Sequence, residues 1–461
     1  ILRLYAGKIF DSEARTLLSN RVITISADSG LIISVSEYDP LAFQLGGNDI
    51  DLRDATVLPG FVDAHVHFFL HAYAETRWDD QVTRESQAER IIRATMHARK
   101  TLLAGYTTVR DLGTEGAGDA DIALRKCLSG PDPIIPGPRY FCANRALIST
   151  GSYGPKSSLH PDKEGADGVT GAEVVDGVDE CKKAVRRQVG AGADWIKVGL
   201  VLLYYHGIRS RMANAAPLVA ASTTPTFDRE ELQAILLEAS RLGVKVAAHA
   251  SDWNHVGSLP FHTLEHGDES LPPPGSEGDS ESDADLAQRW KGRESCRSKS
   301  TTWVPTLSVY RISGGKRWTN ALRTFRAALA AGFDNIACGG DTGPFPHGDN
   351  SLELRLMVEA GAPWDKVLSW ATYGGWKCVR PLTWEGRRGK ARLASVDALE
   401  EDPRVVGDNE VPFGVLRQGF AADIIATTGD LEKDFANAVD KNSISFVMKG
   451  GKVYKRDGKE V

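Results

Sequence analysis

Short apolar, strand-like segments alternate with helix-like segments between residues 57 and 380. The pattern begins with VLPGFVDAHVHF and the helix-like SQAERIIRATMHARKTLLAG, and it ends near NIACGGDTG and SLELRLMVEAG. Such alternation is typical of parallel strands joined by crossover helices. The pattern repeats about eight times, which favours a closed (β/α)8 barrel, the TIM barrel, over an open sheet. The predicted fold class is therefore α/β.

Both ends of the chain have a different sequence pattern, with strand-like segments and few helix-like ones. The segment RVITISADSGLIISV shows β-branched alternation around an Asp-Ser-Gly turn, which is typical of a hairpin. Strand-like segments return after residue 380, in GVLRQGFAADIIAT, SISFVMKGG and KVYKR. We therefore predict that residues 1–56 and 381–461 together build a small β-sandwich beside a barrel formed by residues 57–380.

Composition excludes several classes of partner. The formal net charge of −6 argues against binding to nucleic acid or to an anionic membrane surface, and leaves a small molecule as the expected partner. The six cysteines are scattered, and no CxxC pair occurs, so free thiols in a reducing compartment are expected. We predict a cytoplasmic location. Secretion stays open as an alternative, because the chain begins at Ile1 and a targeting segment can have been removed.

Two histidines end the first strand of the repeat. His65 and His67 occupy alternate positions of PGFVDAHVHF, and side chains at i and i+2 of a strand point to the same face. The alternative is a pair of core histidines with ordinary hydrogen-bond partners. Burying two imidazoles without partners is costly, and a metal ion is the simplest partner for both.

Four more polar residues lie at or near the ends of later strands. A lone buried lysine is unfavourable unless it pairs or loses its charge. Barrel enzymes place their active sites at the carboxyl ends of the strands. The residues are Lys197 in DWIKV, His249 in KVAAHA, His266 in HTLEHG and Asp341 in NIACGGD.

The order His-x-His, Lys, His, His, Asp resembles the amidohydrolase superfamily of metal-dependent hydrolases. The resemblance extends over nearly the whole chain and includes LPGFVDAHVH, GADWIKV, VAAHA, LEHG and GGD. The stretch GFAADIIA is similar to the family's Gly-x-x-Ala-Asp pattern in the flanking β-sandwich. Within the superfamily, the motifs are most similar to the branch of Xaa-Pro dipeptidases, imidazolonepropionase-like amidohydrolases and the fungal ochratoxin-hydrolysing amidase.

The resemblance implies two divalent metal ions, with Zn2+ as the expected metal and manganese, cobalt or iron as alternatives. One ion would be bound by His65, His67 and Asp341, and the second by His249 and His266. Carboxylated Lys197 would bridge both. The implied reaction is hydrolysis of an amide bond by a metal-bridging hydroxide, with Asp341 as general base and then general acid. The substrate would be an N-acyl amino acid, a dipeptide or an ochratoxin-like amide.

Two positions near these motifs have more than one interpretation. His262 shares a strand face with His266 by parity and is the other candidate for that ligand, although LEHG matches the family segment. In the loop STGSYGPK, Ser152 and Tyr153 stand where the dipeptidases often have a histidine, which is a departure from the dipeptidase pattern. Tyr153 is a candidate catalytic residue that would stabilise an oxyanion, with a plain turn tyrosine as the alternative.

Two further segments supply candidate substrate-binding residues. An arginine can bind a carboxylate through two hydrogen bonds, and a tryptophan can stack on an aromatic group. Solvated loop charges and ordinary packing are the alternatives. The candidates are Tyr204, Tyr205, His206 and Arg209 in LLYYHGIR, and Trp253 after the His249 strand.

Two other functions stay open. The same metal site could hydrolyse a lactone or cyclic amide, deaminate a substrate, or decarboxylate a small aromatic acid, although a bridging lysine argues against a typical mononuclear deaminase. A non-catalytic scaffold of the same fold is the second alternative, but scaffolds of this kind typically lose metal ligands, and none is missing here. The resemblance also implies a homo-oligomer.

Overall fold

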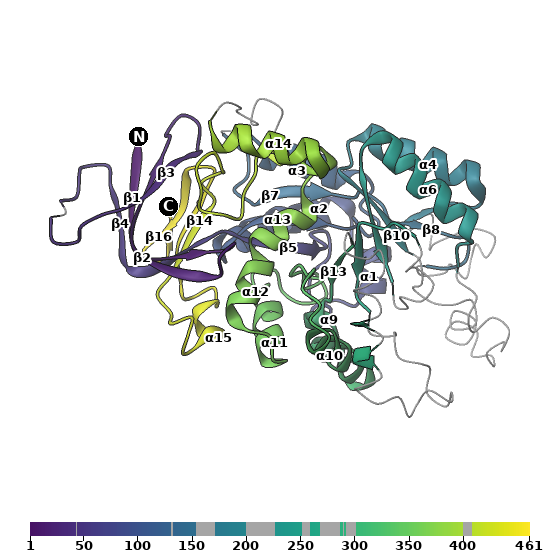
Figure 1. The fold of residues 1–461 in the computed structure, drawn as a ribbon. Coiled ribbons are helices and arrows are strands. Elements are labelled where there is room, and N and C mark those ends of the chain that lie inside the picture. Colours follow the sequence, from purple (N-terminus) through teal and green to yellow (C-terminus); the bar gives the residue numbers. More distant parts are fainter. Residues whose placement is uncertain are drawn as a thin grey trace.

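The computed structural model describes residues 1–42, 44–130, 132–153, 171–199, 226–250, 259–267, 286–288, 290–291, 301–399 and 408–461. These residues form an α/β fold, with parallel strands and their helices on one side and a terminal sheet on the other (Figure 1). The five cysteines that lie within these ranges are all free thiols. No described helix is both long and apolar enough to cross a membrane.

Both ends of the chain contribute to one eight-stranded sheet. β4 (Ile50–Pro59) joins the two ends, because it pairs in parallel with β1 (Leu2–Asp11) and antiparallel with β14 (Ile424–Thr427). The two chain ends therefore share one sheet (Figure 1). In spatial order, its strands are β17 (Lys459–Glu460), β16 (Lys452–Arg456), β15 (Ile444–Lys449), β14 (Ile424–Thr427), β4 (Ile50–Pro59), β1 (Leu2–Asp11), β2 (Thr16–Ile25) and β3 (Ile32–Glu37).

The middle of the chain supplies two sheets of parallel strands. The first contains β5 (Phe61–Val66), β6 (Tyr106–Asp111) and β7 (Arg139–Cys142). The second contains, in spatial order, β13 (Thr302–Val304), β12 (Thr263–Glu265), β11 (Lys245–His249), β10 (Trp195–Gly199), β8 (Leu147–Ile148) and β9 (Glu173–Val174). All six residues of β5 are buried, as expected for a parallel strand that is covered on both faces.

The segment 336–342 connects these two sheets. Isolated parallel bridges join Trp303 to Ile336 and Val66 to Thr342. Because this segment touches β13 on one side and β5 on the other, the first and last parallel strands are held near each other.

Helices cover the parallel strands (Figure 1). They are α1 (Trp78–Arg84) and α2 (Gln87–Leu103) after β5, α3 (Ala120–Leu128) after β6, α4 (Gly177–Ala191) before β10, and α6 (Arg229–Leu242) before β11. After β13 come α9 (Leu307–Ser313), α10 (Gly315–Ala330), α11 (Leu352–Glu359), α12 (Trp364–Ala371), α13 (Tyr373–Val379), η3 (Leu382–Trp384), α14 (Gly386–Asp397) and η5 (Asp408–Glu410). The last is α15 (Phe435–Ala438), between β14 and β15.

Local sequence chemistry determines where α6 begins and ends. The Asp228 side chain accepts a hydrogen bond from the Glu231 backbone, and the Glu231 side chain accepts one from the Asp228 backbone, which is a capping box. Gly243 ends the helix in the left-handed conformation with a φ of 78°, which costs a glycine little. β11 begins two residues later, so the short turn directs the strand toward His249 at its far end.

Buried polar contacts fasten the terminal sheet to the parallel strands. Lys449 on β15 donates from Nζ to the carbonyl oxygen of Gly137 at 2.7 Å. Arg139 on β7 forms a buried ion pair with Asp423 at 3.3 Å. Breaking such a buried pair leaves an uncompensated charge, so these contacts hold the sheet in one position.

Candidate metal centre

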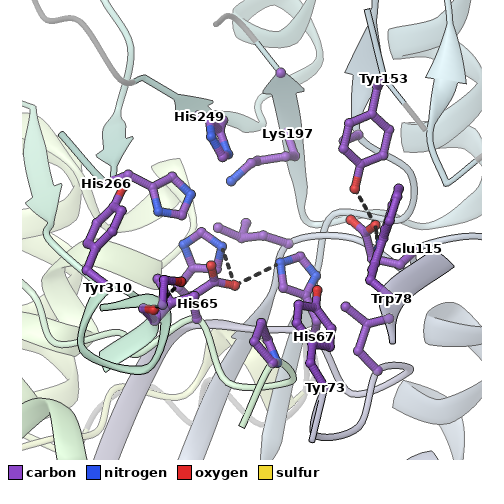
Figure 2. Close-up of a pocket in the computed structure, with 18 of the residues that line it drawn as sticks. His65, His67, Tyr73, Trp78, Glu115, Tyr153, Lys197, His249, His266 and Tyr310 are labelled. Atoms are coloured by element: carbon purple, nitrogen blue, oxygen red, sulfur yellow. Dashed lines mark hydrogen bonds and ion pairs between the residues drawn. The ribbon is translucent and has the colours of Figure 1, made fainter. Parts of the chain in front are cut away.

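His65 and His67 lie together at the carboxyl ends of the parallel strands (Figure 2), and the Asp341 carboxylate lies beside both. The Oδ1 atom of Asp341 lies 3.3 Å from Nε2 of His67 and 3.6 Å from Nε2 of His65. The backbone brings them together, because the Asp341 N–H donates to the His65 carbonyl oxygen at 2.9 Å. One ligand atom from each residue lies within 4.8 Å of the others, a spacing that can hold a metal ion.

A second group of side chains lies beside the first. His249 ends β11, and His266 directly follows β12, whose strand register places Glu265 opposite His249. The rings of His249 and His266 are 4.0 Å apart between centroids, and those of His65 and His266 are 5.0 Å apart. The structure thus gathers the six predicted metal ligands around one pocket: His65, His67, Lys197, His249, His266 and Asp341.

Two of these residues have left-handed backbone conformations. The φ angle is 73° at His266 and 58° at Asp341, a region that non-glycine residues rarely occupy. Backbone hydrogen bonds hold both in place, from His266 to the Val304 carbonyl and from Asp341 to the His65 carbonyl. Such backbone strain is concentrated at functional sites, where the side chain must point in one direction.

Hydrogen bonds at Nδ1 orient three of the imidazoles. His67 Nδ1 donates to the Gly113 carbonyl oxygen at 2.9 Å, and His266 Nδ1 lies 2.8 Å from Thr306 Oγ1. His65 Nδ1 lies 2.9 Å from the Glu265 carboxylate. These partners fix the rings and leave Nε2 as the atom that is available to a metal.

Glu265 is itself held by Arg110. The two side chains are fully buried, and Arg110 Nη2 lies 2.8 Å from Glu265 Oε1. Arg110 also places its guanidinium 4.3 Å from the centroid of the Trp195 ring. Sequence reasoning missed this pair, although Glu265 directly precedes His266 in LEHG, because nothing local shows that it contacts His65.

Burial affects the protonation of most of these groups. It lowers the pKa of His65, His249 and His266 well below the ordinary value, and neighbouring positive charges add to this effect. These imidazoles are therefore neutral, which is the form that binds metals. His67 differs, because its hydrogen bond to Asp341 outweighs burial and raises its pKa to about 9.

Lys197 is buried in the centre of the cluster. Its Nζ has no hydrogen-bond partner among the residues that the structure describes, and its side chain is 4% exposed. Burial lowers the pKa of this amine to about 8, against the opposing charges of Glu265 and Asp341. Burying an amine without a hydrogen-bond partner is unfavourable, so we expect another group to bind or modify this nitrogen.

The pocket above these residues is large enough for a small organic molecule. Its volume is about 480 Å³, within the usual range for ligand sites. The sequence did not predict several of the residues that line it, because nothing in their local pattern sets these aromatic and charged residues apart from others in loops and helices. These residues include Tyr73, Trp78, Glu115, Tyr310 and Arg317.

The other predicted site residues have different outcomes. Tyr153 lines the pocket, and its hydroxyl donates to the Glu115 carboxylate. His262, the alternative to His266, does not line the pocket, and its Nδ1 accepts a hydrogen bond from the Val246 backbone at 3.1 Å. The predicted substrate-binding residues Tyr204, Tyr205, His206, Arg209 and Trp253 lie outside the described residues.

Residues 56–259 match the model of the Amidohydrolase family, and this part of the chain is an amidohydrolase family domain. The match contains the first four predicted metal ligands, His65, His67, Lys197 and His249. It confirms the resemblance expected from the motifs, and it supports a hydrolase that acts on carbon–nitrogen bonds.

Comparison with individual proteins finds similar sequences and similar structures. The chain is 27% identical to an ochratoxinase from Aspergillus niger over 486 residues, which cover 99% of this chain and 87% of the relative. The structure is similar to that of a Xaa-Pro dipeptidase with methionine bound in its active site, with a TM-score of 0.71, 24% identity and coverage of 98% and 99%. It is also similar to the crystal structure of A. niger ochratoxinase, with a TM-score of 0.68, 22% identity and coverage of 99% and 95%. These structural similarities support the α/β fold with parallel-strand sheets.

Proposed function

We propose that this chain is a binuclear, metal-dependent amidohydrolase that cleaves an amide bond in a small molecule. The candidate substrates are N-acyl amino acids, dipeptides and ochratoxin-like amides. The observation that carries the proposal is the convergence of four histidines, one lysine and one aspartate on a single pocket. The similarity to ochratoxinase and to a Xaa-Pro dipeptidase supports amides as the substrate class.

The donor set fits two divalent cations. His65, His67 and Asp341 would hold one, and His249 and His266 would hold the other. Lys197 would bridge them after its neutral amine adds carbon dioxide and releases a proton, which replaces an unpartnered buried amine by an anionic carbamate. Imidazole and carboxylate ligands suit Zn2+. When bound, the cations supply a lowered pKa for water and polarisation of the substrate carbonyl.

Asp341 is placed to move the proton in this reaction. Burial opposes its charge, but the nearby His65 and the hydrogen bond from His67 lower its pKa, so the carboxylate is ionised. It can therefore accept a proton from the attacking water at Oδ1 and return it to the leaving nitrogen. His67 holds the carboxylate in position, since its Nε2 lies 3.3 Å from Oδ1 of Asp341.

We also propose the finer architecture that was predicted from the sequence. The bridges of segment 336–342 to β13 and β5 support closure of the parallel strands of residues 57–380 into a (β/α)8 barrel. For the terminal sheet, buried side chains from β1, β2, β4, β14 and β15 gather in one apolar cluster. Such a cluster supports a sheet that folds over itself as a sandwich.

The test begins with metal content. The purified protein is dialysed against Zn2+ without being unfolded. Elemental analysis is then expected to find two ions per chain. The protein is then assayed against N-acyl amino acids, X-Pro dipeptides, ochratoxin-like amides, lactones and aromatic carboxylic acids. We expect release of an amine and a carboxylic acid from at least one amide.

The Lys197→Ala variant separates the proposal from its competitors. It is expected to lose bound metal and activity together, while a variant of an exposed lysine, Lys433→Ala, keeps both. Turnover confined to acids that lose carbon dioxide would show that the reaction is a decarboxylation. A chain that binds no metal and cleaves nothing would be a scaffold.

A further inference from the structure

Glu115 places a carboxylate in the wall of the pocket and belongs to neither of the two proposed metal-binding groups. It is 6% exposed, and its Oε2 atom accepts hydrogen bonds from Trp78 Nε1, at 3.1 Å, and from the Tyr153 hydroxyl. Figure 2 shows these three side chains together on the His67 side of the pocket, with His249 and His266 on the other side. The proposed metal chemistry does not use this carboxylate.

Glu115 has no ion-pair partner in the described part of the chain, although its charge helps to raise the pKa of the nearby His67. Its hydrogen-bond donors there, an indole and a phenol, are both neutral, and no described cation forms an ion pair with it. The Arg90 guanidinium, which also interacts with this charge, donates instead to the carbonyl oxygens of Phe69 and Thr114. A carboxylate that is buried in this way is best stabilised by a cation entering the pocket.

The surrounding rings favour the same kind of ligand. Trp78 and Tyr153 meet edge to face, with ring centroids 5.5 Å apart, and Tyr73 lines the same side of the pocket. Aromatic rings around an anionic group attract ammonium ions through their negative faces. The arrangement depends on Gly171, since a methyl group there would lie 2.9 Å from Tyr153 Cε1 and 3.4 Å from Glu115 Oε2.

Glu115 is also close to the reaction centre. A methyl group placed on Gly113 would lie 3.6 Å from Glu115 Oε1 and 3.7 Å from His67 Cε1, so the two side chains flank one point. A cation bound by Glu115 would therefore lie on the His67 side of the proposed metal site, a position that suits an amino group close to the scissile carbonyl.

We infer that Glu115, with Trp78 and Tyr153, forms a subsite for the ammonium group of the substrate's acyl half. The preferred substrates are then amides with a free α-amino group, such as unblocked dipeptides, over neutral N-acyl amino acids and ochratoxin-like amides. This inference rests on the proposed amide hydrolysis and narrows its substrate class.

The test uses substrate pairs that differ only in the ammonium group. Glycyl-L-phenylalanine is compared with N-acetyl-L-phenylalanine, and glycyl-L-proline with N-acetyl-L-proline, on the zinc-loaded full chain. We expect the wild-type kcat/KM to be at least about 10-fold higher for the glycyl member of each pair that is cleaved. In Glu115→Gln, the ratio of the two values is expected to fall by about 10- to 100-fold.

Two controls make the result specific. Glu89→Gln makes the same change in net charge on the exposed surface of α2 and should keep the wild-type ratio. Glu115→Asp retains the charge at a shorter reach and should give an intermediate ratio, which a merely structural role would not produce. Zinc content and Tm are measured for each variant, and the wild-type ratio is informative even if Glu115→Gln does not fold.

The outcomes separate the subsite from the proposed function. Equal or better cleavage of the N-acetyl compounds by the wild type, or an unchanged ratio in folded Glu115→Gln, would overturn the subsite and leave amide hydrolysis intact. Cleavage of other amides but of neither pair would also overturn it. Failure to cleave any amide would overturn the proposed function, and the subsite with it.

Discussion

His65 and Glu265 are joined side chain to side chain across 200 residues of sequence. His65 Nδ1 lies 2.9 Å from Glu265 Oε2, and both side chains are almost completely buried. Because a carboxylate accepts the Nδ1 proton, the unprotonated Nε2 of His65 faces Asp341. Glu265 is thus a positioning residue that sets the tautomer of a proposed metal ligand, and Arg110 holds it from the other side.

Replacing Glu265 should weaken metal binding. In Glu265→Gln the amide can no longer act as an anionic acceptor for His65, and Arg110 loses its ion-pair partner. We expect an increase of about 10- to 100-fold in the zinc dissociation constant, measured by competition with a chromogenic chelator. The loss of the buried ion pair should also reduce stability by about 3–5 kcal/mol.

The control for Glu265 is a buried glutamate elsewhere. Glu173→Gln breaks ion pairs with Arg145 and Arg187, neither of which lines the pocket, so zinc affinity should stay at the wild-type value. Equal zinc affinity in Glu265→Gln and wild type would contradict a positioning role for Glu265.

Removing the metal should lower both activity and thermal stability. The cluster gathers three neutral imidazoles, those of His65, His249 and His266, and a buried lysine whose Nζ lacks a partner within the described residues, so bound cations stabilise the folded state directly. At free metal concentrations about 1,000 times the dissociation constant, linkage predicts a stabilisation of roughly 4 kcal/mol. We expect dialysis against a chelator to lower the Tm and Zn2+ to restore it; an unchanged Tm together with full activity would contradict the metal centre.

Tyr153 can be tested as part of the ammonium subsite or as an oxyanion donor. Burial and the neighbouring Glu115 carboxylate raise its pKa well above the ordinary value, so the phenol stays protonated and donates to Glu115. In Tyr153→Phe we expect a higher KM for glycyl-L-phenylalanine with a modest change in kcat. A fall in kcat of about 100-fold or more for both glycyl and N-acetyl substrates would instead support the oxyanion role predicted from the sequence.

The buried carboxylate of Glu353 should make stability depend on pH. It accepts hydrogen bonds from the first residues of α9, Leu307 and Ser308, but burial outweighs them and raises its pKa to about 8 from an ordinary value of 4.5. The folded state therefore holds this proton more tightly than the unfolded state. Its contribution to stability is fully present below the unfolded pKa and is lost as the pH rises through the folded pKa.

The measurement compares wild type with Glu353→Gln, whose side chain does not titrate. With saturating zinc, calorimetry should show that the Tm of the wild type, relative to that of the variant, declines between about pH 5 and pH 8.5. A difference in Tm that is independent of pH would show that Glu353 does not titrate in this range.

Local pattern was sufficient to predict the strand-end residues. His65 and His67 are separated by one residue, and Lys197, His249, His266 and Asp341 each lie at or near the end of a short apolar segment. Since parallel strands present their carboxyl ends on one side, these residues were expected to meet, and they line one pocket. Their role as metal ligands stays a prediction.

Local sequence patterns did not predict the contacts between distant segments. Glu115 and Trp78 lie in or beside loops, and nothing in their neighbourhood indicates that they share a hydrogen bond across the pocket. Likewise, the left-handed conformations of His266 and Asp341 are held by backbone partners on neighbouring segments, not by their own side-chain preferences.

The sequence by itself determined the alternation of strand and helix, the identity of the family and the set of ligand-type residues, because these depend on spacing along the chain. Only the tertiary structure decided that Glu265 orients His65, that Glu115 lines the pocket beside His67, and that the two chain ends share one sheet. The physical reason is that strand register and the packing of loops over the strand ends set these contacts, and both arise only when segments far apart in sequence are brought together.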